Sequence, residues 1–475
     1  MSLSTAMFGA AILIILSTWD WRRSVKIALI LAVIEGAIRK WVLPEASDLV
    51  YFAKDVVLLG AYLRYFVLDQ TRSVTEKFSG VKVLLWIATV IVILQAFNLR
   101  LGSVAVGAFG LKAYLWYVPL CFMARDLFRS AEELQTFLKW YLFLVIPVCS
   151  LGVLQFFSPY DSPINTYAGA SSAADVATFA VEGRENRARI TGTFSYISGH
   201  VTYLFVCLSL IVPLLASGLR KTWLVFVMAE LALVAGNMFM SGSRGPVLMG
   251  VIFVACFLLL NQTTKKRNER SVVVPLVLAG AACVVVSMYW FGEAMDMFWA
   301  RATNADDSRA RVTSGFVEPF EYLLDVETEV AGYGAGATHP GGAALRRRLD
   351  LPDAPELPPG AENETFRVLL ELGLFGFAVW YGLRLYLIWA LWRTWRQLQS
   401  QFLKHLACAA FLVHLFQLPG QVVLNHTLGV YFWLMAGFIY LLPQLEAMAL
   451  NRSPVNPNVA LGPLTRRLRD ATSRV

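Results

Sequence analysis

Apolar runs of about twenty residues recur from one end of the chain to the other. A helix needs about that length to cross roughly 30 Å of hydrocarbon. Only 16% of the 475 residues are charged and 57% are hydrophobic, whereas a typical soluble domain has about 25% charged residues. The sequence therefore predicts an all-α polytopic membrane protein and argues against a soluble multi-domain architecture.

These runs predict about twelve to thirteen transmembrane helices. Their expected spans are 3–19, 24–43, 48–68, 82–98, 103–123, 136–157, 198–217, 222–240, 245–261, 271–291, 365–392, 403–422 and 427–446. The first run has no basic segment ahead of it, so we expect a transmembrane helix rather than a cleaved signal peptide. The 6 cysteines lie inside apolar runs without a CxxC pair, which predicts neither a disulfide framework nor a cysteine-bound metal.

Lys and Arg are concentrated in alternate loops between these spans. The odd-numbered loops are short and basic, and they contain Arg22, Arg23, Lys26, Arg72, Lys77, Lys82, Arg125, Arg129, Arg220, Lys221, the stretch TTKKRNER, Arg393 and Arg396. Because cytoplasmic loops carry the excess of positive charge, this alternation predicts a cytoplasmic C-terminus and external even-numbered loops. Much of the net charge of +8 is then an orientation signal and not evidence for nucleic-acid binding.

The topology divides the chain into six expected segments. These are N-terminal transmembrane helices (1–157), an external loop (158–197), central transmembrane helices (198–291), a large periplasmic loop between the tenth and eleventh helices (292–364), C-terminal transmembrane helices (365–446) and a basic cytoplasmic tail (447–475). Loops longer than about 12–15 residues are usually functional or disordered. The two long external loops are therefore the places to look for a site.

The external loops also contain arginines, which orientation does not explain. Snorkelling or a solvated face accounts for Arg184 and for Arg346, Arg347 and Arg348. Arg189 and Arg244 differ, because each precedes small residues and the start of a helix, in RITGTFSYISG and SRGP. A guanidinium beside the free N–H groups of a helix N-terminus makes an anion site, and its forked geometry favours phosphate. Arg187, Arg309 and Arg311 are further candidates in the same loops.

A second group of polar residues lies where the large loop re-enters the membrane, in GAENETFRVLLELGLFG. Glu364, Arg367 and Glu371 share a helix face, where Arg367 could form a structural ion pair with either glutamate. Glu362 has no basic neighbour in the sequence and stands at the loop–helix junction, where a carboxylate can serve as a general base.

Several ionisable residues fall within the apolar spans themselves. Glu35 or Asp55 can pair with Lys54 or Lys112. Such charged residues within a span, Arg39 included, either support the scaffold or mark a functional path. His200 and His414 are expected to form hydrogen bonds within the core. The sequence has no HExxH and no GxxxxGK[ST] motif, so we expect no ATP-driven chemistry.

Four motifs together resemble the O-antigen ligase/polymerase family, a family of polytopic membrane glycosyltransferases. They are ARITGTFSYISGHVTYL, SGSRGPVLMG, GYGAG and ENETFRVLLELGLFG, which occur in the family's order between about residues 187 and 377. The resemblance implies transfer of a glycan from undecaprenyl diphosphate to an acceptor hydroxyl at the periplasmic face. It implies no nucleotide and no metal cofactor, because the donor is already activated.

The resemblance also implies roles for individual residues. Arg189 and Arg244 would hold the diphosphate leaving group, with Arg187, Asn363, Arg367, Arg309 and Arg311 binding substrate. The family's ligases have a histidine before the asparagine of the last motif, whereas this chain has Glu362, followed by Asn363 and a second carboxylate, Glu364. A carboxylate can still deprotonate a sugar hydroxyl, so both glutamates are candidate catalytic residues.

The departure at Glu362 favours a Wzy-type polymerase of exopolysaccharide or O-antigen over a ligase that transfers glycan to lipid A-core. A polymerase would use lipid-linked oligosaccharides as donor and acceptor in the bacterial inner membrane, with a flippase and a chain-length regulator as possible partners. A transporter of polysaccharide or lipid is the alternative from another class. Paired broken helices in two repeated halves would indicate it, and the sequence has no convincing internal repeat.

Overall fold

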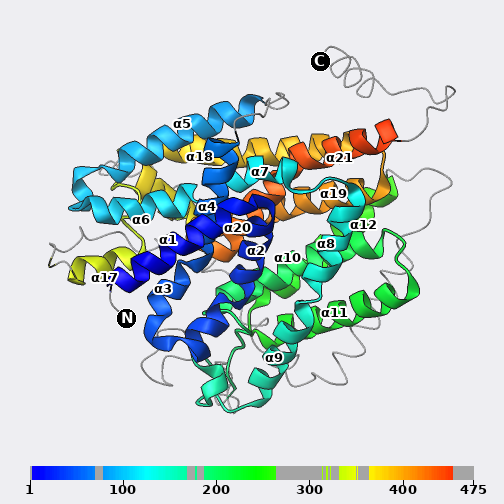
Figure 1. The fold of residues 1–475 in the computed structure, drawn as a ribbon, viewed down its shortest axis with the longest axis horizontal. Coiled ribbons are helices and arrows are strands. Elements are labelled where there is room, and N and C mark those ends of the chain that lie inside the picture. Colours follow the sequence, from blue (N-terminus) through cyan, green and yellow to red (C-terminus); the bar gives the residue numbers. More distant parts are fainter. Residues whose placement is uncertain are drawn as a thin grey trace.

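The computed structural model describes residues 3–69, 79–167, 177–178, 187–263, 313, 317–318, 321, 331–348, 350 and 363–452. Its regular elements in these ranges are helices, and the extended backbone forms two isolated bridges, Pro159 with Arg187 and Thr178 with Ala188. The expectation of an all-α polytopic membrane protein is confirmed (Figure 1).

The α-helices are α1 (Leu3–Trp19), α2 (Trp21–Ala37), α3 (Ser47–Tyr51), α4 (Ala53–Tyr62), α5 (Ser79–Ala96), α6 (Val104–Leu115), α7 (Pro119–Leu127), α8 (Ala131–Leu142), α9 (Val145–Phe157), α10 (Ile197–Leu215), α11 (Lys221–Met240), α12 (Arg244–Thr263), α17 (Pro340–Arg348), α18 (Glu364–Gln397), α19 (Gln401–Phe416), α20 (His426–Ala436) and α21 (Phe438–Arg452). Two π-helices continue α2 and α4, η1 (Ile38–Val42) and η3 (Leu63–Leu68). Short 3-10 turns cover η2 (Pro44–Ala46), η4 (Leu99–Leu101) and η5 (Pro163–Asn165).

Six helical stretches among the described residues are long and apolar enough to cross a membrane, and a seventh is added if the bent pair α20 and α21 is one span. The six are Val104–Leu127, Ala131–Phe157, Ile197–Leu215, Lys221–Met240, Arg244–Asn261 and Glu364–Gln397. Shorter apolar helices cover three more expected spans, at Met7–Trp19, Gly80–Ala96 and Gln401–Phe416. The expected spans 24–43 and 48–68 are interrupted by the changes to π-helix and contain buried charged residues. The expected span 271–291 lies outside the described residues.

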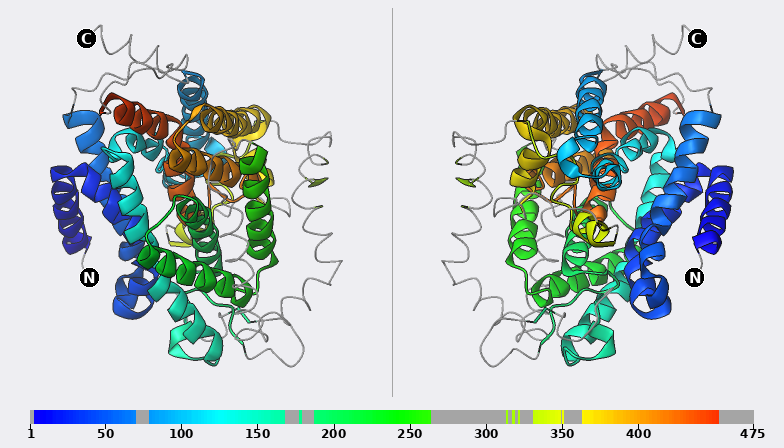
Figure 2. Two further views of the ribbon diagram at one scale, coloured as in Figure 1. Left: turned by 90° about the vertical axis from the view of Figure 1, so that its right-hand side faces the viewer. Right: turned by 90° about the vertical axis from the view of Figure 1, so that its left-hand side faces the viewer.

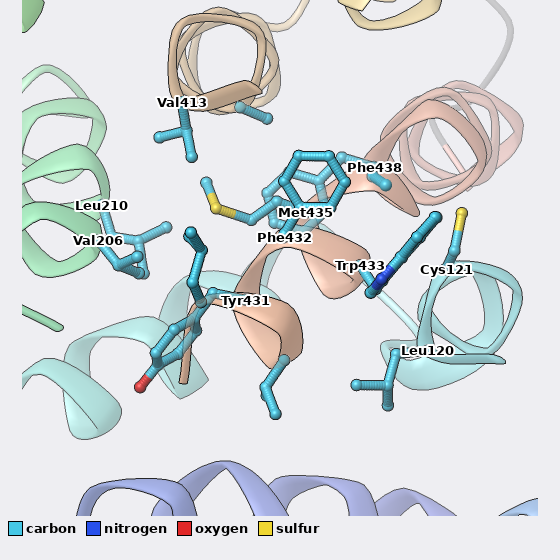
Figure 3. Packing of buried hydrophobic residues seen from close by; sticks show 14 of the residues in the cluster. Leu120, Cys121, Val206, Leu210, Val413, Tyr431, Phe432, Trp433, Met435 and Phe438 are labelled. Carbon is cyan, nitrogen blue, oxygen red and sulfur yellow. The ribbon is translucent and has the colours of Figure 1, made fainter. Parts of the chain in front are cut away.

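The apolar core is centred on the short helix α20, which contacts α2, α7, α10 and α19. Figure 3 shows Tyr431, Phe432 and Trp433 of α20 within this packing. The surrounding helices contribute Val206, Leu210, Leu120, Cys121 and Val413. A helix that is apolar on every side is buried in a protein core or in a membrane, and most of the side chains of α20 are buried by the neighbouring helices. By contrast, α1 lies at the edge of the helices in both views of Figure 2 and exposes much of its apolar surface.

The odd-numbered loops and the C-terminal end of α21 contact one another. Lys26 forms an ion pair with Glu133 at 2.8 Å, which joins loop one to loop five. The amides of Gln399 and Ser400 donate to Glu446 at 2.8 and 2.6 Å, which joins loop eleven to the end of α21. These contacts join segments that the charge alternation assigns to one set of loops.

The even-numbered loops form a second set with its own contacts. Trp41 donates to the carbonyl of Pro163 at 3.0 Å, so loop two contacts loop six. Asn98 donates to Gly332 at 3.2 Å, so loop four contacts loop ten. Asn425 of loop twelve donates to the carbonyl of Ser198 at 3.2 Å. Residues far apart in the sequence are thereby gathered around one end of the helices.

Candidate functional site

A cavity of about 370 Å³ lies where these even-numbered loops meet. Its walls come from α2, η1, α3, α4, the 194–199 segment, residues 339–340 at the start of α17 and the residues around the start of α20. The lining residues are Ala32, Glu35, Gly36, Arg39, Tyr51, Lys54, Phe194, Ser195, Tyr196, Ser198, Gly199, His339, Pro340, Leu424, Asn425, His426 and Thr427. The volume falls within the roughly 300–1,000 Å³ typical of small-molecule sites.

One wall of the cavity is the backbone of residues 193–195, which lies directly against α2 at Gly36. A Cβ added at Gly36 would lie 2.4 Å from the amide nitrogen of Ser195 and 2.5 Å from the carbonyl oxygen of Thr193. The Thr193 hydroxyl donates to the carbonyl of Val33 at 2.5 Å. Glycine is therefore needed at position 36, because any side chain would displace the wall.

The preceding residues are held by two buried polar side chains. The Gln155 side-chain oxygen accepts from the amides of Thr191 and Gly192 at 3.1 and 2.7 Å. The Lys40 ammonium donates to the Thr191 hydroxyl at 3.1 Å and to the Gly192 carbonyl at 2.9 Å. The Gly-Thr-Phe motif is thus fixed from two sides, so the position of the cavity wall depends on η1 and α9 together.

The charged residues of the cavity contact partners in the surrounding elements. Lys54 forms an ion pair with Glu35 at 2.6 Å, and both side chains are almost fully buried. Arg39 lies 4.0 Å from the other oxygen of Glu35, and it donates to Ser47 and, at 3.0 Å, to the Ser195 hydroxyl. Burying a charge is tolerable only when it is paired or hydrogen-bonded. Glu35 is shared between Lys54 and Arg39, so the charged residues of the lining are two cations and one carboxylate.

A second buried pair lies behind the cavity. Lys112 pairs with Asp55 at 2.8 Å, and Tyr117 donates to the other Asp55 oxygen at 2.7 Å. The pairing expected within the apolar spans is confirmed, with Glu35 taking Lys54 and Asp55 taking Lys112. The ring of Tyr51 lies against both ammonium groups, at 4.9 Å from Lys54 and 4.2 Å from Lys112.

The Gly-rich segment 331–339 crosses α18 at a break in that helix. Gly373 has a φ of 69° there, and a Cβ at Gly332 would lie 2.6 Å from the Gly373 nitrogen. The amides of Tyr333 and Gly334 donate to the carbonyls of Leu370 and Glu371, at 2.8 and 3.1 Å. The segment is therefore docked on α18, and it delivers His339 to the cavity.

Thr338 connects this segment to the polar face of α18. Glu371 accepts from the Thr338 amide at 3.0 Å and from its hydroxyl at 2.6 Å. Arg367 donates to the Thr338 carbonyl at 2.9 Å and contacts its hydroxyl. Burial and then the positive charges of Arg367 and Lys112 lower the pKa of the neighbouring His339 to about 4, so its imidazole is neutral at neutral pH.

Glu364 lies at the first position of α18 and is 1% exposed. One of its oxygens pairs with Arg384 at 3.4 Å and accepts from the Val423 amide at 3.0 Å. Arg384 also donates to the carbonyls of Gln417 and Gly420. Glu364 is thus directed toward the 417–423 segment and does not line the cavity. Asn363 precedes it at the N-cap position, without a capping hydrogen bond from its side chain.

The arginines of loops six and eight form a separate cluster. Arg189 donates to the Ser241 carbonyl at 3.1 Å and to the Ser243 hydroxyl at 2.6 Å. Those serines belong to the turn between α11 and α12, in which Gly242 has a φ of 64°. Arg244 follows as the first residue of α12 and is half-buried. The structure therefore brings Arg189 to the turn that presents Arg244, although neither arginine is among the residues that line the cavity.

The other candidates from the sequence lie at the end of α9 or outside the described residues. Arg187 donates weakly to the carbonyls of Phe156 and Phe157, at 3.4 Å each, at the end of α9. Glu362, Arg309, Arg311 and Arg184 lie outside the described residues.

Sequence reasoning passed over several residues that the fold brings to the cavity. Asn425 and His426 belong to no motif, and Tyr196 lies inside the motif ARITGTFSYISGHVTYL without having been singled out. His339 was a lone histidine in a Gly-rich stretch. The only available signal was their shared position in even-numbered loops, which predicts one side of the membrane but does not bring them together.

Residues 229–381 match the model of a protein family described as O-antigen ligase. The matched range runs from α11 to the middle of α18 and includes Arg244, the Gly-rich segment and Arg367. It confirms the expected resemblance to the O-antigen ligase/polymerase family and supports a function of that general type. No curated protein matches the chain.

Proposed function

We propose that this membrane protein is a glycosyltransferase that polymerises undecaprenyl-diphosphate-linked oligosaccharide units at the periplasmic face of the bacterial inner membrane. The observation that carries the proposal is the contact of Arg189 with the turn that begins α12 at Arg244, within a chain that matches the O-antigen ligase family. Two guanidinium groups near a helix N-terminus suit a diphosphate, because the fork and the free N–H groups both favour phosphate oxygens.

The proposed reaction exchanges one bond at the anomeric carbon of the donor sugar. The acceptor hydroxyl oxygen forms a new bond to that carbon, while the bond from the carbon to the diphosphate oxygen breaks. Undecaprenyl diphosphate leaves with the bonding electron pair, and Arg189 and Arg244 stabilise the charge that develops on it. The Glu362 carboxylate takes the proton of the acceptor hydroxyl. The donor supplies its own leaving group, so the balance needs no nucleotide.

Several further features belong to the same proposal. The even-numbered loops face the periplasm, the C-terminus lies in the cytoplasm, and Asn363, Arg367, Arg187, Arg309 and Arg311 assist substrate binding. Glu364 is proposed to hold the 417–423 segment rather than to act on substrate, because its buried carboxylate is paired with Arg384.

Replacement of Arg244 tests the donor site. In an Arg244→Ala strain, lipid-linked glycan should remain as single repeat units, and Arg244→Lys should retain part of the activity because it keeps the charge without the fork. Arg220→Ala is a matched control, since Arg220 precedes the first residue of α11 at the end of an odd-numbered, basic loop. Glycan size is read by gel electrophoresis of the material on the lipid carrier, at equal protein levels. Unchanged chain length in Arg244→Ala would refute the role of this residue.

The same assay separates the polymerase from the ligase. Loss of a polymerase leaves single units on the carrier, whereas loss of a ligase leaves polymerised glycan stranded there. Glu362→Gln tests the proposed base independently of the diphosphate site. Unchanged turnover in that variant would remove Glu362 from the mechanism.

A further inference from the structure

The cavity of about 370 Å³ has an excess of positive charge in its lining. Arg39 and Lys54 stand against one carboxylate, Glu35, which Lys54 contacts at 2.6 Å. Since buried charges need counter-charges, the excess cation favours an anionic ligand. We propose that this cavity is a second anion site, which binds the diphosphate headgroup of a lipid-linked substrate. This inference rests on the proposed function and gives it a second diphosphate site, apart from Arg189 and Arg244.

Arg39 keeps part of its guanidinium available to a ligand. Its Nε donates to Ser47, and its Nη1 donates to the Ser195 hydroxyl at 3.0 Å and lies 4.0 Å from Glu35. Its Nη2 forms no hydrogen bond with the residues that the structure describes. A guanidinium has five N–H donors, and its planar fork matches the oxygens of a phosphate. Arg39 is therefore the cation that we expect to contact the ligand directly.

The elements around the cavity add positive charge and do not cancel it. Behind the cavity, Lys112 is matched by Asp55 at 2.8 Å, so this pair contributes no net charge. On the other side of the 193–195 wall, Lys40 is 7% exposed and donates to Thr191 and Gly192. It forms no ion pair with a described residue. Buried charges are screened much less than exposed ones, so Lys40 strengthens the attraction of this region for an anion.

Helix α10 begins in the wall of the cavity and adds backbone donors. Ser198 and Gly199, the second and third residues of α10, line the cavity. Tyr196 at the N-cap position forms no side-chain hydrogen bond with this turn. The N–H groups of a first helical turn have no partner within the helix and carry partial positive charge, which favours an anion. The cavity thus combines a guanidinium with backbone and hydroxyl donors, which are the groups that bind phosphate.

The place of the cavity fits the second lipid-linked substrate rather than the donor. Arg189 and Arg244 do not line it, and residues 190–193 separate Arg189 from the first lining residue of that segment, Phe194. In the proposed polymerisation the acceptor stays attached to its own diphosphate. Its attacking hydroxyl lies on the glycan, at least one sugar away from that diphosphate. The two diphosphates must therefore bind at separate places, as the cavity and the turn before Arg244 are.

The experiment counts the lipid diphosphates that bind to the full-length protein. Native mass spectrometry in detergent, with undecaprenyl diphosphate as the titrant, gives the number bound to each chain and their dissociation constants. Undecaprenol, which lacks the diphosphate, measures binding through the isoprenoid chain alone. Inorganic diphosphate is added as a competitor, because a site for a free anion would bind it as tightly as it binds the lipid.

We expect two undecaprenyl diphosphates per chain beyond the binding of undecaprenol. Arg39→Gln should weaken one of them about tenfold or more, equivalent to about 1.4 kcal/mol. Glu35→Gln should tighten the same one, because it removes the carboxylate that repels the ligand. Misfolding cannot explain two opposite shifts, and Arg39→Lys should restore part of the affinity. Arg100→Gln is the matched control, since Arg100 is an exposed arginine of loop four that does not line the cavity.

A wild type that binds only one undecaprenyl diphosphate, or an Arg39→Gln protein that binds two as tightly as the wild type, would overturn the second site. Weaker binding by Glu35→Gln would overturn it as well. Displacement of this lipid by an equal concentration of inorganic diphosphate would overturn the assignment to a lipid-linked substrate.

Failure of the proposed function is a different result. In that case Arg244→Ala would keep both lipids and make glycan of normal length. If both proposals hold, Arg244→Ala loses one lipid and keeps the one that Arg39→Gln weakens.

Discussion

The ion pair between Glu364 and Arg384 gives a prediction that separates a structural from a chemical role. Both side chains are at most 2% exposed, and their closest atoms are 3.4 Å apart. Coulomb's law with an effective dielectric constant of about 20 gives an attraction of about 5 kcal/mol across that distance. Desolvation offsets much of this attraction, but removal of one partner strands the other charge and costs about 3–5 kcal/mol.

Two substitutions of Glu364 should therefore differ in stability. Glu364→Ala leaves the Arg384 guanidinium buried without its carboxylate, so we expect the free energy of unfolding to fall by about 3–5 kcal/mol. Glu364→Gln keeps an oxygen that can accept from the Val423 amide and from Arg384, so we expect a loss of only about 1–2 kcal/mol. Unfolding by SDS in mixed micelles, followed by tryptophan fluorescence, measures both losses against the wild type.

A control and an activity measurement complete this test. Glu446 also accepts from two backbone amides, but the contact is exposed. Glu446→Ala should therefore lower the free energy of unfolding by only about 1 kcal/mol. If Glu364→Gln were as destabilising as Glu364→Ala, the structural reasoning would be wrong. Loss of glycan transfer in a stable Glu364→Gln protein would place Glu364 in the chemistry, contrary to the role proposed here.

Two further predictions concern the cavity wall and its histidine. Gly36→Ala should lower the free energy of unfolding by about 1–3 kcal/mol, because the new Cβ would meet the backbone at Ser195. Gly382→Ala is the control, since a Cβ there has nothing within 4 Å and should not destabilise the protein. Denaturation of both variants measures the difference. The lowered pKa of His339 predicts that wild-type stability falls as the pH drops from about 6.5 to about 4 and then levels off, because only the unfolded state binds the proton in that window. His339→Gln should lack this component, and the same pH dependence in both proteins would contradict the argument.

Composition and periodicity were sufficient to predict the fold class, because a chain this apolar can satisfy its backbone polar groups in a bilayer only as helices or a closed barrel. The lengths of the runs predicted most helix positions. They did not predict that α2 and α4 would continue as π-helices or that α18 would break at Gly373. The break at Gly373 lies where the Gly-rich segment docks on α18, a contact between segments far apart in the sequence.

The charge pattern predicted that each buried carboxylate would have a lysine as its partner, but not which lysine. A charge in an apolar span needs a counter-charge, so the sequence predicted that Glu35 and Asp55 would pair with Lys54 and Lys112. The structure decided which lysine each carboxylate takes.

The helix face of Glu364, Arg367 and Glu371 shows the limit of such patterns most clearly. The spacing predicted an ion pair of Arg367 with one of the glutamates, but Glu364 pairs with Arg384, and both Arg367 and Glu371 bind Thr338. Neighbours on one helix are only candidates for pairing, because buried groups take their partners from whichever element packs against them.

The sequence by itself determined that this is a helical membrane protein with two sets of loops, and it singled out Arg189 and Arg244. Both conclusions rest on local chemistry, namely the cost of burying polar groups and the charge of short loops. Only the tertiary structure joined Arg189 to the turn before Arg244 and gathered Tyr196, His339 and His426 around one cavity. A cavity is made by segments distant in the sequence, so its lining is settled by how the helices pack.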